Sequence, residues 1–139
     1  MAIPPRQLAC GLCVAAVALG LTACGETAST SSFKGESHSV AQSVSDFQSD
    51  ATAGDQKKLC ENDLSSALTA RLKSSGGCQT VLKNQLHELD ALNLTIESIA
   101  VNGATASARV KSTWSGKGRT TTLSLVKEGA RWKISGAQS

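Results

Sequence analysis

Ile99-Ala100-Val101-Asn102-Gly103-Ala104-Thr105-Ala106 is the stretch that decides the fold, because Asn-Gly joins two runs of alternating residues there. Asn-Gly between alternating apolar positions is the strongest short-range signal for a β-hairpin. As a two-residue turn, Asn102-Gly103 would pair Val101 with Ala104. From Leu94 onward apolar residues recur at every second position, so the second half of the chain is predicted to form a sheet.

Two further turns are predicted downstream of this hairpin. Ser115-Gly116-Lys117-Gly118 is predicted to be a four-residue turn, and Glu128-Gly129 a two-residue turn. The three turns agree on which side of the strands is apolar, which favours a four-stranded antiparallel meander. The predicted cross-strand pairs include Val110 with Leu123 and Leu125 with Trp132.

The two faces of the predicted sheet differ in chemistry. The polar face carries four basic candidates for binding, Arg109, Lys111, Arg131 and Lys133. Glu97 falls on the apolar face in this register, whereas Leu94 and Ile96 fall on the polar face. The other residues of the apolar face are Ile99, Val101, Ala104, Ala106, Ala108, Val110, Trp114, Leu123, Leu125, Trp132 and Ile134.

Three helices are predicted before the sheet, because apolar residues recur at helical spacing. The first runs over 37–53 and ends at Gly54. The second begins at Asp55 and is interrupted near Asn62-Asp63, and the third carries Cys78, Leu82, Leu86 and Leu89. These helices must cover the apolar face of the sheet, so the fold class is α+β.

The N-terminus reads as a secretory signal. Arg6 is the only charged residue in the first 25, and the apolar run after it is about 15 residues long, shorter than a membrane-spanning helix. Leu21-Thr22-Ala23-Cys24 resembles the bacterial lipobox, which implies lipid on Cys24 and cleavage before it. The alternatives are a signal cut elsewhere or a retained N-terminal helix.

This interpretation divides the chain into a lipoprotein signal over 1–23, a lipidated cysteine with a flexible tether over 24–39, and one domain over 40–139. The protein is then exported and anchored through its acylated Cys24 to the outer face of the bacterial cell membrane. The bilayer is its first predicted partner.

Cysteine usage agrees with export. Cys10 and Cys13 fall in the signal and Cys24 takes the lipid, which leaves Cys60 and Cys78 as an even pair in an oxidising compartment. One disulfide between them is predicted. Metal binding is the alternative, but it needs more ligands than the two histidines of the chain provide, so no metal or cofactor is expected.

Composition excludes several function classes. The net charge of +3 is too mild to indicate nucleic-acid binding, and a chain with no Tyr, two Phe and two Trp offers no stacking platform for bases. The motifs of serine hydrolases, zinc proteases and P-loop enzymes are missing from the sequence.

Three helices followed by a curved antiparallel sheet resemble the NTF2-like (cystatin-like) superfamily. The last hairpin, Glu128-Gly129-Ala130-Arg131-Trp132-Lys133-Ile134, is similar to the closing hairpin of that superfamily, and the resemblance covers about 37–135. The paired cysteines also resemble small actinobacterial lipoproteins of this class. Enzymes of the superfamily such as ketosteroid isomerase use Tyr and carboxylic acids, and this chain has no Tyr.

Two non-catalytic functions are weighed first. The domain is interpreted as a protein-interaction module of the cell envelope, whose basic face suits an acidic partner or anionic headgroups. The alternative is a pocket for a small apolar ligand between helices and sheet, lined by Glu97, Ala106, Trp114 and Trp132.

Each of these interpretations has a plainer counterpart. Without a binding function, the basic face would be an ordinary solvated surface. The alanines of the apolar face would then be positions where the helices pack closely. An enzyme with Glu97 as its base is ranked third, because one carboxylate is not a catalytic constellation. A bulge or a position at the sheet edge would turn Glu97 to solvent instead.

Overall fold

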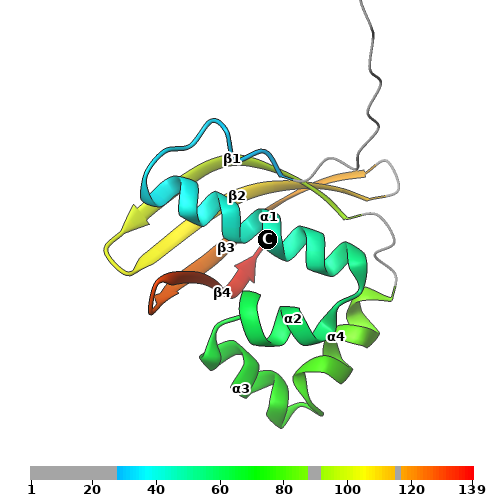
Figure 1. Ribbon diagram of the computed structural model, residues 1–139. Coiled ribbons are helices and arrows are strands. Elements are labelled where there is room, and N and C mark those ends of the chain that lie inside the picture. The colour runs from blue at the N-terminus through cyan, green and yellow to red at the C-terminus, as the bar shows by residue number, and fades with distance from the viewer. Residues whose placement is uncertain (1–27, 88–91, 115–116) are drawn as a thin grey trace, which may run out of the picture.

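The computed structural model describes residues 28–87, 92–114 and 117–139, and shows an α+β domain with a helical layer on one face of an antiparallel sheet (Figure 1). The strands follow one another in the sheet in the order of the sequence, as a meander. The described elements are α1 (Glu36–Ala53), α2 (Gln56–Lys58), the π-helical turn η1 (Leu59–Asp63), α3 (Ser66–Ser74), α4 (Cys78–Leu86), β1 (Asn93–Asn102), β2 (Thr105–Trp114), β3 (Lys117–Glu128) and β4 (Arg131–Gln138).

Helix α1 lies across the sheet and contacts β1, β2 and β4. It forms because Val40, Val44 and Ala51 recur on one side, where they are buried against the strands. Gly54 ends the helix with a φ of 69°, and its N–H donates to the Ala51 carbonyl at 3.2 Å. The predicted first helix is confirmed, with Glu36 as its first residue.

The second predicted helix is interrupted, as expected near Asn62-Asp63. Asp55 Oδ1 accepts a hydrogen bond from the Lys58 N–H at 3.0 Å and begins α2, which continues directly into η1. Ser65 then begins α3 by accepting from the Leu68 N–H at 3.2 Å. Two side-chain caps within one predicted helix therefore produce two separate helices.

A disulfide joins Cys60 of η1 to Cys78, the first residue of α4, across a sequence separation of 18. The predicted pairing is confirmed. The third predicted helix is confirmed as α4 up to Leu86, and Leu89 lies outside the described residues. The disulfide therefore holds η1 against the start of α4, in the part of the helical layer outside α1.

The free edge of β4 is covered by the segment that joins η1 to α3. Leu64 forms a parallel bridge with Ile134, and the Ser65 N–H donates to the Ile134 carbonyl at 2.8 Å. Arg71 Nη2 donates to the Ser135 carbonyl at 3.0 Å. This pairing satisfies backbone groups that an edge strand otherwise leaves unpaired.

The first hairpin turns one position later than predicted. Its turn residues are Gly103 and Ala104, so Val101 pairs with Ala106 and not with Ala104. Gly103 has a φ of 59°, which fits a type II′ turn with Gly at the first central position. Since the register moves by two residues, this shift by itself leaves the side chains on their predicted faces.

The other two hairpins are corrected in the same way. Lys117 and Gly118 belong to β3 and not to a turn, so Val110 pairs with Thr121 rather than Leu123. In the last hairpin the turn residues are Gly129 and Ala130, and Trp132 pairs with Lys127 rather than Leu125. The predicted partners were wrong, whereas the predicted meander is confirmed.

β1 contains a β-bulge between Ile96 and Ser98, at Glu97. The extra residue changes which side of the strand faces the helices. Leu94 is buried, at 6% exposure, so its predicted position on the polar face was wrong. Ile96 pairs with the buried Val110 and lies on the same inner face.

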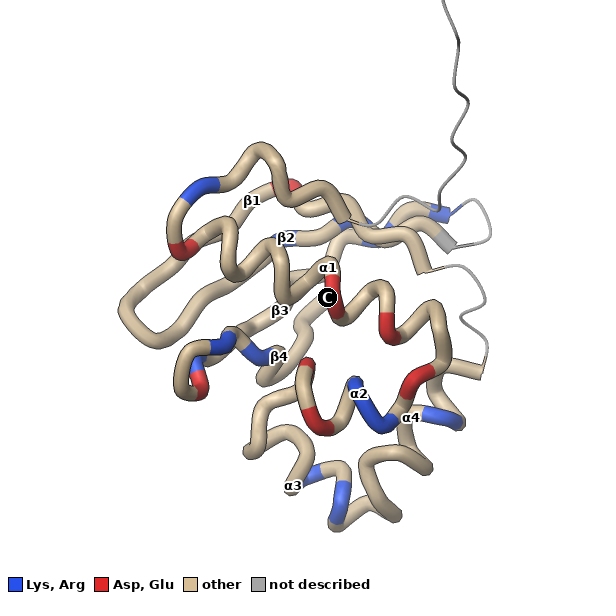
Figure 2. Tube along the Cα trace, in the orientation of Figure 1, with Lys and Arg blue, Asp and Glu red and all other residues tan. Residues whose placement is uncertain are grey.

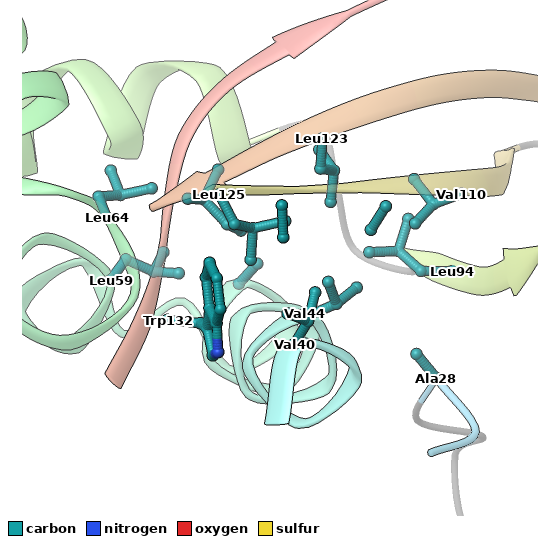
Figure 3. Close-up of a cluster of buried hydrophobic side chains, with 14 of the residues drawn as sticks. Ala28, Val40, Val44, Leu59, Leu64, Leu94, Val110, Leu123, Leu125 and Trp132 are labelled. Atoms are coloured by element: carbon teal, nitrogen blue, oxygen red, sulfur yellow. The ribbon is translucent and has the colours of Figure 1, made fainter. Parts of the chain in front are cut away.

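The core fills the space between α1 and the sheet (Figure 3). Trp132 of β4 extends towards α1, beside Val40 and Val44, and Leu59 of η1 closes the same cluster. The other buried apolar residues of the cluster are Ala28, Ala51, Leu64, Leu82, Leu94, Ala106, Ala108, Val110, Leu123, Leu125 and Ile134.

The predicted flexible tether over 24–39 is folded onto the domain from Ala28 onward. Ala28 is 3% exposed, and its N–H donates to Gln48 Oε1 of α1 at 2.9 Å. The Phe33 N–H then donates to the Thr30 carbonyl at 3.2 Å, and α1 begins at Glu36. The prediction of a flexible tether was wrong from Ala28 onward, because the polar composition of this segment does not indicate that one alanine is buried.

Candidate functional site

Glu97 lies on the outer face of the sheet, away from the helices. Arg109 Nε donates to Glu97 Oε2 at 3.0 Å, and the two side chains are 61% and 38% exposed. The bulge in β1 produces this orientation, so Glu97 does not reach the space between helices and sheet. Its predicted position on the apolar face was wrong.

The inner face is filled where the predicted pocket would lie. Ala106 and Trp132 are 8% and 2% exposed, and both belong to the core cluster with Val40. The side chain of Trp114 lies outside the described residues. The structure therefore does not bring the predicted pocket residues together, because Glu97 is separated from Ala106 and Trp132 by the sheet.

Trp132 fastens the start of α1 to the last hairpin. Its indole Nε1 donates to Glu36 Oε2 at 2.8 Å, and Lys127 Nζ donates to Glu36 Oε1 at 2.7 Å. The hydrogen bond from Lys127, followed by that from Trp132, lowers the pKa of Glu36. Lys127 Nζ also lies 5.8 Å from the centre of the indole ring. This cluster therefore has a structural role, since it holds the start of α1 against the last hairpin.

The four predicted basic residues lie in different surroundings. Arg109 is paired with Glu97, and the Lys133 side chain is only 18% exposed, with Nζ donating to the Glu61 carbonyl at 3.0 Å. Arg131 lies where the last hairpin meets α1. Lys111 is exposed and forms no salt bridge within the described residues. They do not form one uniform patch.

Sequence reasoning missed a buried carboxyl group, Asp63 of η1, which is 5% exposed. Burial first, and then the neighbouring Asp50 and Asp46, raise the pKa of Asp63 to about 7, against an opposing effect of Arg131. Asp46 and Arg131 also line a hollow of about 280 Å³ between α1 and the last hairpin. No periodic pattern marks Asp63, because it lies in a π-helical turn.

A second missed feature is an open groove of about 660 Å³ between α3 and α4. The Cys60–Cys78 disulfide lines it, and Lys73 supplies a positive charge. The other residues that line it are Ser66, Thr69, Ala70, Gly77, Gln79 and Thr80. The cysteine pairing was the available signal, since it brings the two helices together.

A third feature is the end of the sheet where β2 passes to β3, which we call the basic hairpin end and define as Lys111, Lys117 and Arg119 (Figure 2). All three are exposed and none forms a salt bridge within the described residues. From Ser98 through Lys127 the sequence contains no Asp or Glu. Lys117 was predicted to lie in a turn, whereas it belongs to β3.

Residues 36–137 match a protein family described as "Putative lumazine-binding". The chain belongs to this family. The match begins at Glu36, the first residue of α1, and extends into β4, so it covers the complete α+β domain. No curated protein sequence matches the chain.

Solved structures show the same fold at low identity. A SEC-C motif protein from Rhodopseudomonas palustris is 15% identical with a TM-score of 0.53, over 71% of this chain and 76% of its own. A variant of Rd1NTF2_05 is 13% identical with a TM-score of 0.53, over 75% of this chain and 98% of its own. A putative NTF2-like transpeptidase from Campylobacter jejuni is 20% identical with a TM-score of 0.48, over 64% and 90%. The match to the Rd1NTF2_05 variant, with its TM-score of 0.53, confirms the predicted NTF2-like fold.

Two observations bear on location. Within residues 28–87, 92–114 and 117–139, no helix has the length and apolar character needed to cross a membrane. The Cys60–Cys78 disulfide is consistent with export to an oxidising compartment. Cys24 and the predicted signal lie outside the described residues.

Proposed function

We propose that this chain is an exported, lipid-anchored protein of the cell envelope, whose NTF2-like domain is a non-catalytic binding module. The resemblance of Leu21-Thr22-Ala23-Cys24 to the lipobox supports the anchor. The Cys60–Cys78 disulfide supports export. Membership in a family described as binding, rather than catalytic, supports the role of the domain.

The observation that carries this proposal is the outer face of the sheet. Helix α1 lies on the opposite face, and no described element covers the outer face at β1, β2 and β3 (Figure 1). The face is polar, and its members at the paired positions include Thr95, Ser98, Thr105, Ser107, Arg109, Lys111, Thr120, Thr122 and Ser124. A polar surface with a net positive charge suits an acidic surface on another envelope protein.

Photo-crosslinking in whole cells tests this role. A photoreactive residue in place of Ser107 or Thr122, on the outer face, should yield an adduct with one protein of defined mass. The same residue in place of Ala67, which is exposed on α3, is the control. An adduct of the same mass from all three positions, or no adduct from the outer face, would contradict the proposal.

The groove beside the disulfide favours a second function, the binding of a small molecule. Its volume of about 660 Å³ is within the range of ligand pockets, and Lys73 with Thr69 and Gln79 offers polar contacts. The description of the family makes lumazine the first probe. This site differs from the pocket predicted between helices and sheet.

A matched pair of variants tests the groove. Ala70 and Ala67 are both exposed on α3, but only Ala70 lines the groove. Lumazine titrated into the mature protein should give a calorimetric signal that Ala70→Trp abolishes and Ala67→Trp preserves. Equal binding by both variants would place the ligand elsewhere, and no signal with the unsubstituted protein would exclude lumazine.

A further inference from the structure

Ala28 fixes the point from which the N-terminal segment leaves the domain. Its N–H donates to Gln48 Oε1 at 2.9 Å, and its side chain is buried in the cluster that contains Leu94 (Figure 3). Gln48 Nε2 in turn donates to the Leu92 carbonyl at 3.0 Å. One glutamine of α1 therefore ties the N-terminal segment to the start of β1.

The start of β1 lies at the end of the sheet that carries the basic hairpin end. Asn93 pairs with Thr113 of β2, and Thr113 pairs with Gly118 of β3. Neighbouring strands lie about 4.8 Å apart, so these three residues span roughly 10 Å. Ala28 and the hairpin are thus joined through Gln48, Leu92 and two strand pairings at one end of the molecule.

The short distance in sequence to the predicted anchor limits how far this end can lie from a membrane. Cys24 precedes Ala28 by four positions. A fully extended chain spans at most about 3.5 Å per residue, so these positions extend over roughly 14 Å. Acyl chains on Cys24 would hold Ala28 within about that distance of the bilayer surface.

The charge at this end matches an anionic surface. Lys111, Lys117 and Arg119 are exposed and without salt bridges in the described part of the chain. Arg109 of the same hairpin is neutralised by Glu97. Each lysine or arginine close to an anionic membrane strengthens binding about fivefold.

We propose that the basic hairpin end rests on anionic lipid headgroups beside the acyl anchor, so that this end of the sheet faces the bilayer. This inference rests on the proposed lipid anchor at Cys24. Electrostatic contact and the short connection from Cys24 to Ala28 act at the same end of the domain. The membrane thereby holds the domain in one orientation, with the α3–α4 groove outside the contact.

Lysine reactivity in the acylated mature protein tests this orientation. The protein is reconstituted into vesicles of phosphatidylcholine alone or with about one third phosphatidylglycerol, and a membrane-impermeant amine reagent is added. Lys111 and Lys117 should react more slowly in the anionic vesicles, because contact with the headgroups shields them from the reagent. Lys57 and Lys73, which are exposed on α2 and α3, should react equally in both. Equal rates at all four lysines would overturn the proposal.

Charge reversal gives a second readout without the acyl chains. Soluble mature protein with Cys24→Ala should sediment with the phosphatidylglycerol vesicles at low salt, and Lys117→Glu with Arg119→Glu should weaken this at least tenfold. Lys57→Glu with Lys73→Glu is the control of equal charge and should have no effect. An equal loss in the control would overturn the proposal. This assay does not depend on acylation. A negative result would therefore count against the membrane contact of the basic hairpin end, whereas the lipid anchor itself is tested separately by the modification of Cys24 in cells.

Discussion

Arg109 Nε and Glu97 Oε2 lie 3.0 Å apart on the outer face of the sheet, although alternation along β1 predicts an inward Glu97. The bulge at Glu97 produces this pair and turns Leu94 into the core. One extra residue in β1 therefore determines which residues of this strand pack against the helices.

The bulge predicts opposite sensitivities at two nearby positions. Leu94→Ala should lower the free energy of unfolding by about 2–5 kcal/mol, because Leu94 is buried. Glu97→Ala should lower it by at most about 1 kcal/mol, because the pair with Arg109 is exposed to solvent. Urea denaturation of both variants provides the measurement. A tolerant Leu94 with a sensitive Glu97 would indicate a strand without the bulge.

Asp63 should make the protein less stable as the pH rises. Its pKa is about 7 in the folded state, chiefly through burial, against an ordinary value of 3.8, so the folded state binds more protons than the unfolded state between these values. Stability falls with rising pH over such a range. Unfolding in urea should therefore show a loss of stability from about pH 4 to 7, and Asp63→Asn should remove most of this slope. The same slope in both proteins would contradict the assignment.

Trp132 and the lysines of the sheet test which side chains are buried. Trp132→Ala should cost about 3–5 kcal/mol, as for a large aromatic residue removed from a core. Lys111→Glu should change stability by less than about 0.5 kcal/mol because the residue is exposed. Lys133→Glu should cost about 1–3 kcal/mol because it loses the bond to the Glu61 carbonyl and faces Glu128. Thermal or urea unfolding in which Lys111→Glu costs more than Trp132→Ala would show that the sheet faces are exchanged.

The disulfide should contribute to stability through the loop that it closes. Cys60 and Cys78 are 18 positions apart, and a loop of this length corresponds to about 3 kcal/mol in the chain-entropy model. Replacement of both cysteines by Ser should lower the free energy of unfolding by about that amount. Alkylation of the native protein without reductant should modify neither residue. Rapid labelling of both cysteines would show that the bridge does not form.

The sequence was sufficient to assign the faces of β2, β3 and β4, but not to assign the cross-strand partners. Asn102-Gly103 and Gly103-Ala104 both satisfy the chemistry of a two-residue turn, and only the second brings Val101 opposite Ala106. The two registers differ by two residues, so the apolar face is the same in both. Turn chemistry alone does not separate the two registers.

The candidate sites were harder to predict, because they depend on contacts between distant segments. Alternation gave Glu97 the wrong face, since no residue pattern in β1 indicates the bulge. The groove at the disulfide forms only because the chain breaks before α3 and because α4 packs beside α3. Ala28 is buried in the core cluster and bonded to Gln48, twenty positions away, which no local pattern reveals.

The mass of the mature protein extracted from membranes tests the central claim, which is a binding module anchored by lipid at Cys24. The account predicts a chain that begins at Cys24 and carries acyl groups, partitions into detergent, and loses both properties in the Cys24→Ala variant. A membrane-extracted chain with an unmodified Cys24, or one that still begins upstream of it, would contradict the anchor and with it the proposed location.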